Sequence, residues 1–296
     1  MLKAYQNKDI KIIRVYGDDA NEYLNNIVTN NTDHVNTSNS IYSCLLTPQG
    51  KFLADFFISE FDNGFCLLVN SKFYEDLMKG LNFYKLRSKV SIEDITNSYK
   101  YLFVPFDNIN AFFNSTNVSL GHTTQDDTAY AFNDPRIDKF GIHIVSDKNS
   151  FGKNELDIVE GDCLDFFLEN GILGMHLIED LTKFYPLENN LHFLNAVDFK
   201  KGCYVGQELT ARMKLRNKIP RTIIPFVLDV KSNANLDNVK IKEKDNVVGE
   251  IIFQRDKFLF GHITLRKLSD KISSDMKFFL DEQQLKINQQ NWLIFK

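Results

Sequence analysis

The residues best suited to chemistry lie in one short stretch, 200–213, with the sequence KKGCYVGQELTARM. Cys203 stands between Gly202 and Gly206, and glycines let the backbone take positive φ or approach a ligand closely. The residues after the second glycine have the composition of a helix with a glutamate in its first turn. Because a nearby lysine charge and a helix N-terminus both favour thiolate over thiol, the spacing predicts a reactive thiol at Cys203 with Lys201 as its electrostatic partner.

A purely structural role for Cys203 is the alternative, because free cysteines are commonly buried and inert. Against it stands the crowding of lysine, cysteine, tyrosine, glutamine, glutamate and arginine at one turn-to-helix junction, where a structural turn needs only the glycines. The other cysteines, Cys44, Cys66 and Cys163, lie far apart, with no Cys-x-x-Cys pair and no histidine at zinc-ligand spacing. We therefore expect no zinc ribbon, no thioredoxin-type motif and no self-contained metal or cluster ligand set.

The composition is that of an ordinary globular protein. Of the 296 residues, 43% are hydrophobic and 25% are charged, which excludes disordered, collagenous and coiled-coil chains. The formal net charge of -4 gives no global positive field for nucleic acid, and no apolar run approaches the ~20 residues of a membrane span. The N-terminus lacks the apolar stretch of a secretory signal. We expect a soluble protein with free thiols in a reducing compartment, with no nucleic-acid or membrane partner.

The first part of the chain alternates strand and helix signals. A strand is expected over 11–16, then a helix over 19–28 that Asp19 and Glu22 begin with a capping box. Turn signals divide 41–69 into a three-stranded antiparallel meander. Ser71 is expected to cap a helix that ends near residue 86, and a further strand covers 89–95.

In the rest of the chain, the pattern of helix and strand signals changes twice. We read 97–150 as two strands, 101–104 and 140–145, joined by long loops, and 154–170 as a helix that stops at Gly171. Beyond Pro220 the β-rich runs suit a small antiparallel barrel or sandwich; they cover 222–230, 247–253, 258–265, 277–280 and 291–295. The predicted domains are a body over 1–216 and a barrel over 217–296.

The stretch KGCYVGQE, 201–208, resembles the signature K-G-C-[FY]-x-G-Q-E of the folate-binding YgfZ family. Mitochondrial members of that family assist the assembly of four-iron iron–sulfur clusters, and the family is related to the glycine-cleavage T-protein, an aminomethyltransferase. Three further segments resemble the family: 17–30, with GDDA, YL and VTN; 46–56, with LTPQGK and ADF; and YPLENNL at 185–191. The similarity spans nearly the whole chain and thins over 97–150 and in the C-terminal barrel.

The resemblance implies an α+β fold, with a two-lobed folate-binding body around a central channel, followed by a small C-terminal antiparallel β-barrel. It implies a tetrahydrofolate-binding protein that supports iron–sulfur cluster assembly or repair, with Cys203 as its functional thiol. The location it implies is the cytoplasm in bacteria or the mitochondrial matrix in eukaryotes. The expected partners are folate and iron–sulfur client or assembly proteins, while the clients, the natural folate and the oligomeric state stay open.

The resemblance also places folate-binding residues. Glu169 matches a carboxylate that holds the pterin ring, and an ionised carboxylate can accept the paired hydrogen bonds of the 2-amino group and N3–H. The family's arginine two residues earlier is Phe167 here, and Glu169 read by itself could be a solvated residue in a last helical turn. Tyr204 and Gln207, within the signature, are assigned to the cofactor as well.

A second departure from the T-protein pattern bears on catalysis. T-proteins carry an acidic pair after the first hairpin turn, and the matching residues here are Ala54 and Asp55. Because half of the pair is missing, the resemblance favours a maturation factor, although Asp55 alone could be a strand-edge residue. The alternative functions are a folate-dependent one-carbon (aminomethyl) transferase or demethylase, and a pure binding module. Whether the protein is an enzyme stays open at this point.

A cluster bound at Cys203 would have to be shared. A lone thiolate supplies one of the four ligands that a cluster usually has, so a partner chain or a small thiol would provide the rest, and binding would be transient. The basic residues after the signature form either a solvated face or a contact for the polyglutamate tail of folate or an acidic partner; they are Arg212, Lys214, Arg216, Lys218 and Arg221.

Overall fold

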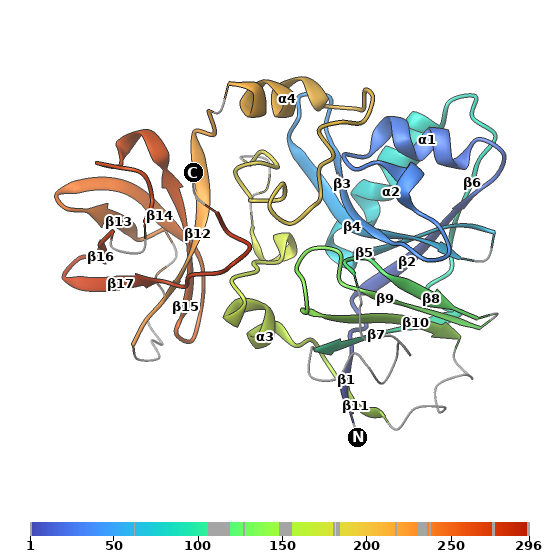
Figure 1. Ribbon diagram of the computed structural model, residues 1–296, viewed down its shortest axis with the longest axis horizontal. Helices are drawn as coiled ribbons and strands as arrows, with labels where there is room; N and C mark the ends of the chain where they lie inside the picture. Colours follow the sequence, from blue (N-terminus) through green and yellow to red (C-terminus); the bar gives the residue numbers. More distant parts are fainter. Residues whose placement is uncertain are drawn as a thin grey trace. The chain divides into compact units, whose positions relative to one another are not determined.

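The computed structural model describes residues 2–61, 63–105, 119–126, 128–147, 156–179, 181, 184–216, 218–229, 236, 238–273 and 276–294. The chain divides into two compact units, whose elements are labelled in Figure 1. The first comprises Met1–Cys163 and Leu194–Gln207, and the second comprises Leu164–Phe193 and Glu208–Lys296. The barrel unit therefore includes segments that precede residue 217, and the division into domains at 216/217 stays a prediction.

The first unit contains a five-stranded antiparallel sheet in the order β3-β4-β5-β2-β6. Its strands are β2 (Ile10–Tyr16), β3 (Ile41–Leu46), β4 (Phe52–Phe61), β5 (Gly64–Asn70) and β6 (Ser91–Asp94). The predicted strand at 11–16, the meander over 41–69 and the strand within 89–95 are confirmed. Alternation along β4 places Ala54, Phe56 and Ile58 in the core and leaves Asp55 half-buried between them.

Helices α1 (Ala20–Ile27) and α2 (Ser71–Lys85) confirm the two predicted helices, and α2 packs against β4 and β5. Each buries one face, as the apolar spacing indicated. The predicted caps are wrong. Asp19 makes no cap and accepts instead from the Lys89 backbone N at 2.7 Å. The side chain of Asn70, one residue before Ser71, caps α2 by accepting from the backbone N of Lys72 at 3.0 Å.

A second sheet of the first unit has the order β11-β1-β7-β10-β9-β8. It contains β1 (Leu2–Gln6), β7 (Tyr99–Pro105), β8 (Thr123–Gln125), β9 (Ala129–Asn133), β10 (Gly141–Asp147) and β11 (Leu156–Glu160). The two strands expected at 101–104 and 140–145 are confirmed as β7 and β10, which pair with each other. The expectation of only loops between them is wrong, because β8 and β9 form a hairpin there.

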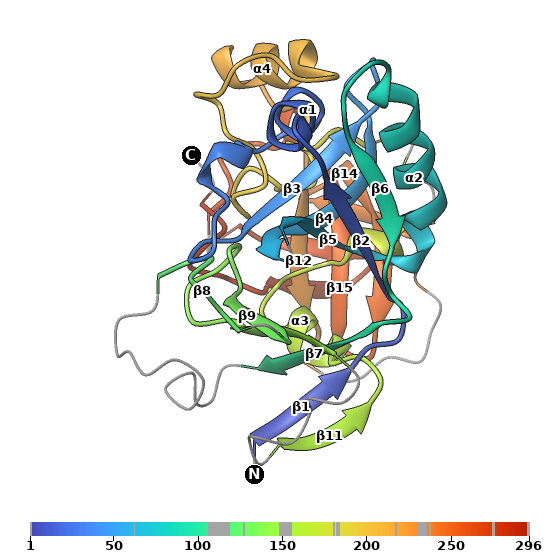
Figure 2. The ribbon, with the colours of Figure 1, turned by 90° about the vertical axis from the view of Figure 1, so that its right-hand side faces the viewer.

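The helix expected over 154–170 is also wrong in its first half. Residues 156–160 form β11, which pairs in parallel with β1, and the two strands lie side by side in Figure 2. This pairing joins segments more than 150 positions apart in the sequence, so local periodicity could not reveal it. Only Leu164–Glu169 is helical, as α3, and Gly171 with φ 70 follows it, as predicted.

The second unit contains a closed antiparallel barrel in the order β12-β15-β14-β13-β16-β17. Its strands are β12 (Arg221–Val227), β13 (Lys240–Glu243), β14 (Asn246–Arg255), β15 (Phe258–Thr264), β16 (Phe278–Leu280) and β17 (Gln283–Ile287). The predicted barrel is confirmed, with two errors: β13 was not predicted, and residues 291–294 are not a strand, since β17 closes the barrel instead. Its interior is apolar, with Ile224, Phe226, Leu259 and Phe278 almost fully buried.

Short helices complete the described chain: η1 (Thr32–His34), η3 (Met175–Leu177), α4 (Gln207–Leu215) and η5 (Leu265–Lys267). Helix α4 begins at Gln207, directly after the second glycine of the signature, and carries Glu208 in its first turn, as predicted. Within the described residues, no helix combines the length and the apolar character needed to cross a membrane.

Candidate functional site

The segment that carries Cys203, Leu194–Gln207, is fastened to the end of α1 and the residues after it by side-chain and backbone hydrogen bonds. The Thr29 hydroxyl donates to the Ala196 carbonyl at 2.6 Å, and the Val205 amide donates to the Asn26 carbonyl at 3.2 Å. The segment therefore has a fixed path on the first unit at both ends of the signature, although it is an irregular stretch without strand or helix of its own before α4.

Lys201 makes three further hydrogen bonds to the same region. Its Nζ donates to the backbone carbonyls of Asn25, Val28 and Asn30 at 2.6, 2.8 and 2.8 Å. An ammonium has three donors, so all of them are used, and lysines suit the unpaired carbonyls at a helix C-terminus. Burial lowers the pKa of Lys201 to about 8. The structure thus gives Lys201 a positioning role, while its role as electrostatic partner of Cys203 stays a prediction.

Cys203 is the exposed thiol of the chain. All four cysteines are free, and Cys44, Cys66 and Cys163 are buried, whereas Cys203 is exposed. Burial raises the pKa of the Cys44 and Cys163 thiols to about 12, which makes them poor nucleophiles at neutral pH. The alternative reading of Cys203 as a buried core residue is therefore wrong, and a reagent or partner in solution can reach its sulfur.

The two glycines beside Cys203 have different roles. Gly206 has φ 78, and a Cβ there would lie 2.4 Å from the Thr47 carbonyl oxygen, so the chain passes directly over the turn between β3 and β4. A Cβ on Gly202 would meet nothing within 4 Å. Gln207 Nε2 donates to the Gly202 carbonyl at 3.4 Å across the intervening turn. Only Gly206 is thus required by close packing.

Tyr204 and Asp55, both predicted to contact the cofactor, are held by other side chains of the first unit. Tyr204 is buried, and the Lys201 ammonium lies 5.3 Å from its ring centroid. Asp55 accepts a hydrogen bond from the Tyr42 hydroxyl. The guanidinium of Arg136 lies 5.3 Å from the Tyr42 ring centroid, which brings Asp55 to the edge of a polar network that the sequence did not suggest.

That network is a buried chain of charged and polar groups. Arg136 donates to Asp134 through Nη2 at 2.7 Å and Nε at 3.0 Å, and His143 Nε2 lies 2.9 Å from the same carboxylate. Since a carboxylate only accepts, His143 carries its proton on Nε2 and accepts from the Tyr101 hydroxyl at Nδ1, 2.7 Å away. Burial alone would raise the pKa of Asp134, but Arg136 and His143 outweigh it and hold that pKa well below its usual range. Burial lowers the pKa of His143, so its ring is neutral.

Two asparagines connect this network to the Cys203 segment. Asn195 Nδ2 donates to the carbonyl of Pro135 at 3.1 Å and to that of Arg136 at 3.3 Å. Asn30 Nδ2 in turn donates to the Asn195 carbonyl at 2.8 Å. The only sequence signal for this arrangement was the run NDPRID at 133–138, where an acid and a base flank a proline; it was read as loop.

Glu169 belongs to the second unit, whereas the other predicted site residues lie in the first: Asp55, Lys201, Cys203, Tyr204 and Gln207. It is the last residue of α3, and its side chain is exposed. Its backbone carbonyl accepts from Asn288 Nδ2 at 3.1 Å and from Gln290 Nε2 at 3.0 Å, which fixes the end of the helix. Its carboxylate has no partner among the described residues and can accept hydrogen bonds from a ligand.

In the described part of the chain, no group of three or more His, Cys, Asp or Glu side chains gathers in metal-binding geometry.

Gly206→Ala should loosen the Cys203 segment. The added Cβ meets the Thr47 carbonyl at a positive φ, and such strain costs about 1–3 kcal/mol. Hydrogen exchange of 198–207 should become faster and the urea midpoint should fall. Gly202→Ala, which adds the same group in open space, is the matched control. Equal protection of 198–207 from hydrogen exchange in the two variants would contradict the close contact between Gly206 and the turn at Thr47.

Asp134→Asn should destabilise the first unit by about 3–5 kcal/mol at neutral pH, because it leaves the Arg136 charge buried without its partner. The folded-state pKa of Asp134 lies below the unfolded value of about 4, so the stabilisation by the wild-type carboxylate is present above that pH and is lost as the pH falls further. Urea unfolding should show a constant difference between pH 5 and 8 that shrinks at pH 3. A difference independent of pH would contradict this assignment.

Comparisons with known proteins agree with the architecture. The GCVT N-terminal domain family matches residues 7–105. The glycine cleavage system aminomethyltransferase T from Bartonella henselae has the same fold, with a TM-score of 0.76 over 100% of this chain and 88% of that chain, at 14% sequence identity. This likeness concerns the fold alone.

Curated relatives are named iron–sulfur cluster assembly factor IBA57 or its homolog, mitochondrial. Identity is 30% to the Neurospora crassa protein over 74% of this chain and 52% of that protein, and 30% to the Dictyostelium discoideum protein over 76% and 62%. The human protein is 27% identical over 72% and 63%. The chain thus spans between about half and two thirds of the length of these relatives. In sequence and fold together, the chain is similar to the IBA57 assembly factors and to the glycine-cleavage T-protein.

Proposed function

We propose that this protein binds tetrahydrofolate and supports iron–sulfur cluster assembly or repair through the Cys203 thiol. The observation that carries the proposal is the contrast among its cysteines: three are buried, and the exposed one lies in the signature turn. A thiol kept exposed by a rigidly fastened segment is suited to bind something that arrives from solution. The names of the relatives suggest that the bound species is an iron–sulfur cluster.

Cys203 would act as a transient ligand. One thiolate fills one of the four positions that a cluster usually needs, so a partner chain or a small thiol completes the set. Tight fastening of the segment by Lys201 lowers the entropy lost when such a partner binds, because the sulfur already has a defined place. The exposed position also allows the cargo to leave, as assembly or repair requires.

The carboxylates fit the donor groups of a pterin. A pterin presents a 2-amino group beside N3–H, and a free carboxylate such as that of Glu169 can accept both. Asp55, oriented by Tyr42, is a second acceptor, while Tyr204 and Gln207 are proposed contacts from the signature. Ala54 is fully buried in place of the second T-protein acid, so the acidic pair of an aminomethyltransferase is incomplete. This favours maturation over one-carbon transfer.

Cys203→Ala should abolish maturation and spare folate binding. The expected result is loss of the activity of a four-iron enzyme in cells that depend on the variant, with the tetrahydrofolate Kd changed less than about twofold. Iodoacetamide followed by mass spectrometry should label Cys203 in the native wild type and leave Cys44 and Cys163 unlabelled. Full maturation by Cys203→Ala would refute the role of the thiol.

Glu169→Gln should weaken tetrahydrofolate binding by about tenfold or more, since a hydrogen bond to a charged group contributes roughly 1.5–3 kcal/mol. Titration calorimetry measures the Kd. Asp165→Asn removes an exposed acid from the same helix, where it pairs with Arg255 at 3.0 Å, and serves as the control. Unchanged affinity in Glu169→Gln would remove the pterin contact from the proposal without touching the thiol.

A further inference from the structure

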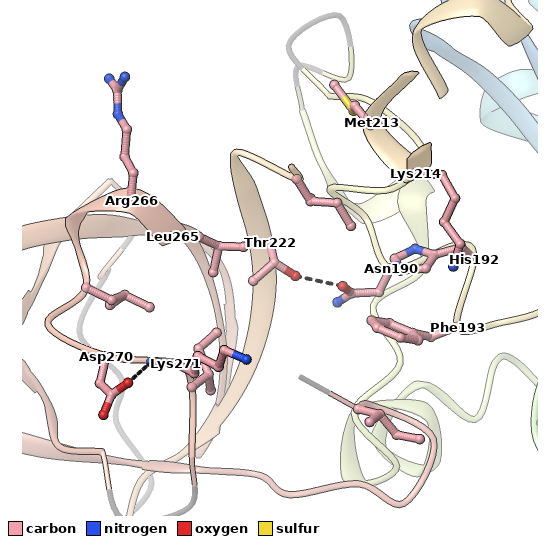
Figure 3. Close-up of a pocket in the computed structure, with 14 residues that line it drawn as sticks. Asn190, His192, Phe193, Met213, Lys214, Thr222, Leu265, Arg266, Asp270 and Lys271 are labelled. Atoms are coloured by element: carbon pink, nitrogen blue, oxygen red, sulfur yellow. Dashed lines mark hydrogen bonds between the residues drawn. The ribbon is translucent and has the colours of Figure 1, made fainter. Parts of the chain in front are cut away.

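The second unit contains a pocket that the proposed function does not use. It has a volume of about 460 Å³, within the range of small-molecule sites. Figure 3 shows its walls, which come from the turn at 190–193, the end of α4, the start of β12, and the η5 region through residue 272. All fourteen lining residues belong to the barrel unit, so the pocket can be described within that unit.

One wall is fixed by a hydrogen-bonded asparagine. Asn190 has φ 60 and accepts from the Thr222 hydroxyl at 2.7 Å, the bond drawn in Figure 3. Its Nδ2 donates to the Ile223 carbonyl, also at 2.7 Å. Both Asn190 and Thr222 are buried. The 190–193 turn is therefore held against β12, and the pocket does not have to form when a ligand arrives.

Half of the residues that line the pocket are apolar. Phe193, Leu265, Leu268, Ile272 and Ile294 line it, and Ile294 is 52% exposed. The ring of Phe193 lies against that of His192, with centroids 4.0 Å apart. Removing such apolar surface from water is favourable, so these residues would favour an apolar ligand body.

The charges around these apolar residues are mostly positive. Among the described lining residues are the cations Lys214, Arg266 and Lys271 and one carboxylate, Asp270. In Figure 3 the Lys271 ammonium points toward the side of Asn190 and Phe193, and Lys214 extends toward His192, while Arg266 points away. Burial and the Lys214 charge lower the pKa of His192 to about 4, so at neutral pH it adds no charge.

We propose that this pocket binds an organic anion with an apolar body. The body lies among Phe193, Leu265 and Ile272, and the anionic group lies between Lys271 and Lys214. The apolar residues favour an apolar body, and the excess of cations over the one carboxylate favours an anionic group, as in an amphipathic carboxylate or sulfonate. The inference does not rest on the folate and thiol proposal, although Lys214 also belongs to the basic run that could contact the polyglutamate tail of folate.

The test uses the full chain labelled with ¹³C-methyl methionine. Met213 lines the pocket, and Met78 on α2 in the first unit is the internal reference. Decanoate represents an aliphatic body and 2-naphthoate an aromatic one. At least one should shift the Met213 methyl resonance in a saturable way and leave Met78 unchanged, and added salt should weaken binding. The probe that binds more tightly identifies the body.

Variants test the charge complementarity. Lys271→Met and Lys271→Glu should weaken binding about tenfold or more, the loss of one charge-assisted contact. Lys286→Glu makes the same charge change on an exposed lysine of the same barrel that does not line the pocket, and should change the Kd less than about twofold. Three results overturn the inference: no Met213 shift with either probe, equal losses in the Lys271 and Lys286 variants, or displacement of the probe by stoichiometric tetrahydrofolate, which would make the pocket part of the folate site.

Discussion

The described site depends on the three hydrogen bonds of the Lys201 ammonium. A helix of eight residues such as α1 leaves its last carbonyls without intrahelical partners, and burial of such groups is costly. Lys201, from a segment far along the chain, satisfies the carbonyl of Asn25 in the last turn of α1 and those of Val28 and Asn30 just after the helix. These hydrogen bonds therefore fix the chain at the end of α1, and Cys203 lies at the surface two residues after Lys201.

The Cys203 segment also depends on a buried ion pair, through Asn195. Asn195 contacts the backbone of Pro135 and Arg136, whose guanidinium is neutralised by Asp134. Such a pair contributes little net stability against apolar packing, but it has strict geometric demands, since removal of either partner leaves a buried charge. The network therefore fixes the 134–136 turn, and that turn fixes Asn195. The Cys203 segment is held between a helix end and an ion pair.

Sequence reasoning predicted well where local pattern decides structure. The spacing around Phe73 and Leu77 fixed α2, and the glycines around Cys203 located the exposed thiol. It failed where distant segments pair: β11 was read as helix because its partner β1 lies at the other end of the unit. The Asp134–His143 contact joins residues only nine positions apart, and it was missed because β9 was not predicted: the pairing of β10 with β9 brings a histidine in an apolar run beside an acid.

The use of Lys201 constrains how Cys203 can be activated. Its three donors are directed at carbonyl oxygens, so the ammonium has none left to hydrogen-bond a thiolate. An effect of Lys201 on the sulfur could therefore come only from its charge, and this effect stays a prediction, as does that of the first turn of α4, which begins four residues after Cys203. Both effects require the turn to keep its shape, and Gly206 is the residue whose missing side chain allows that shape over Thr47. The surrounding residues therefore act on the thiol by fixing its position rather than by a direct hydrogen bond.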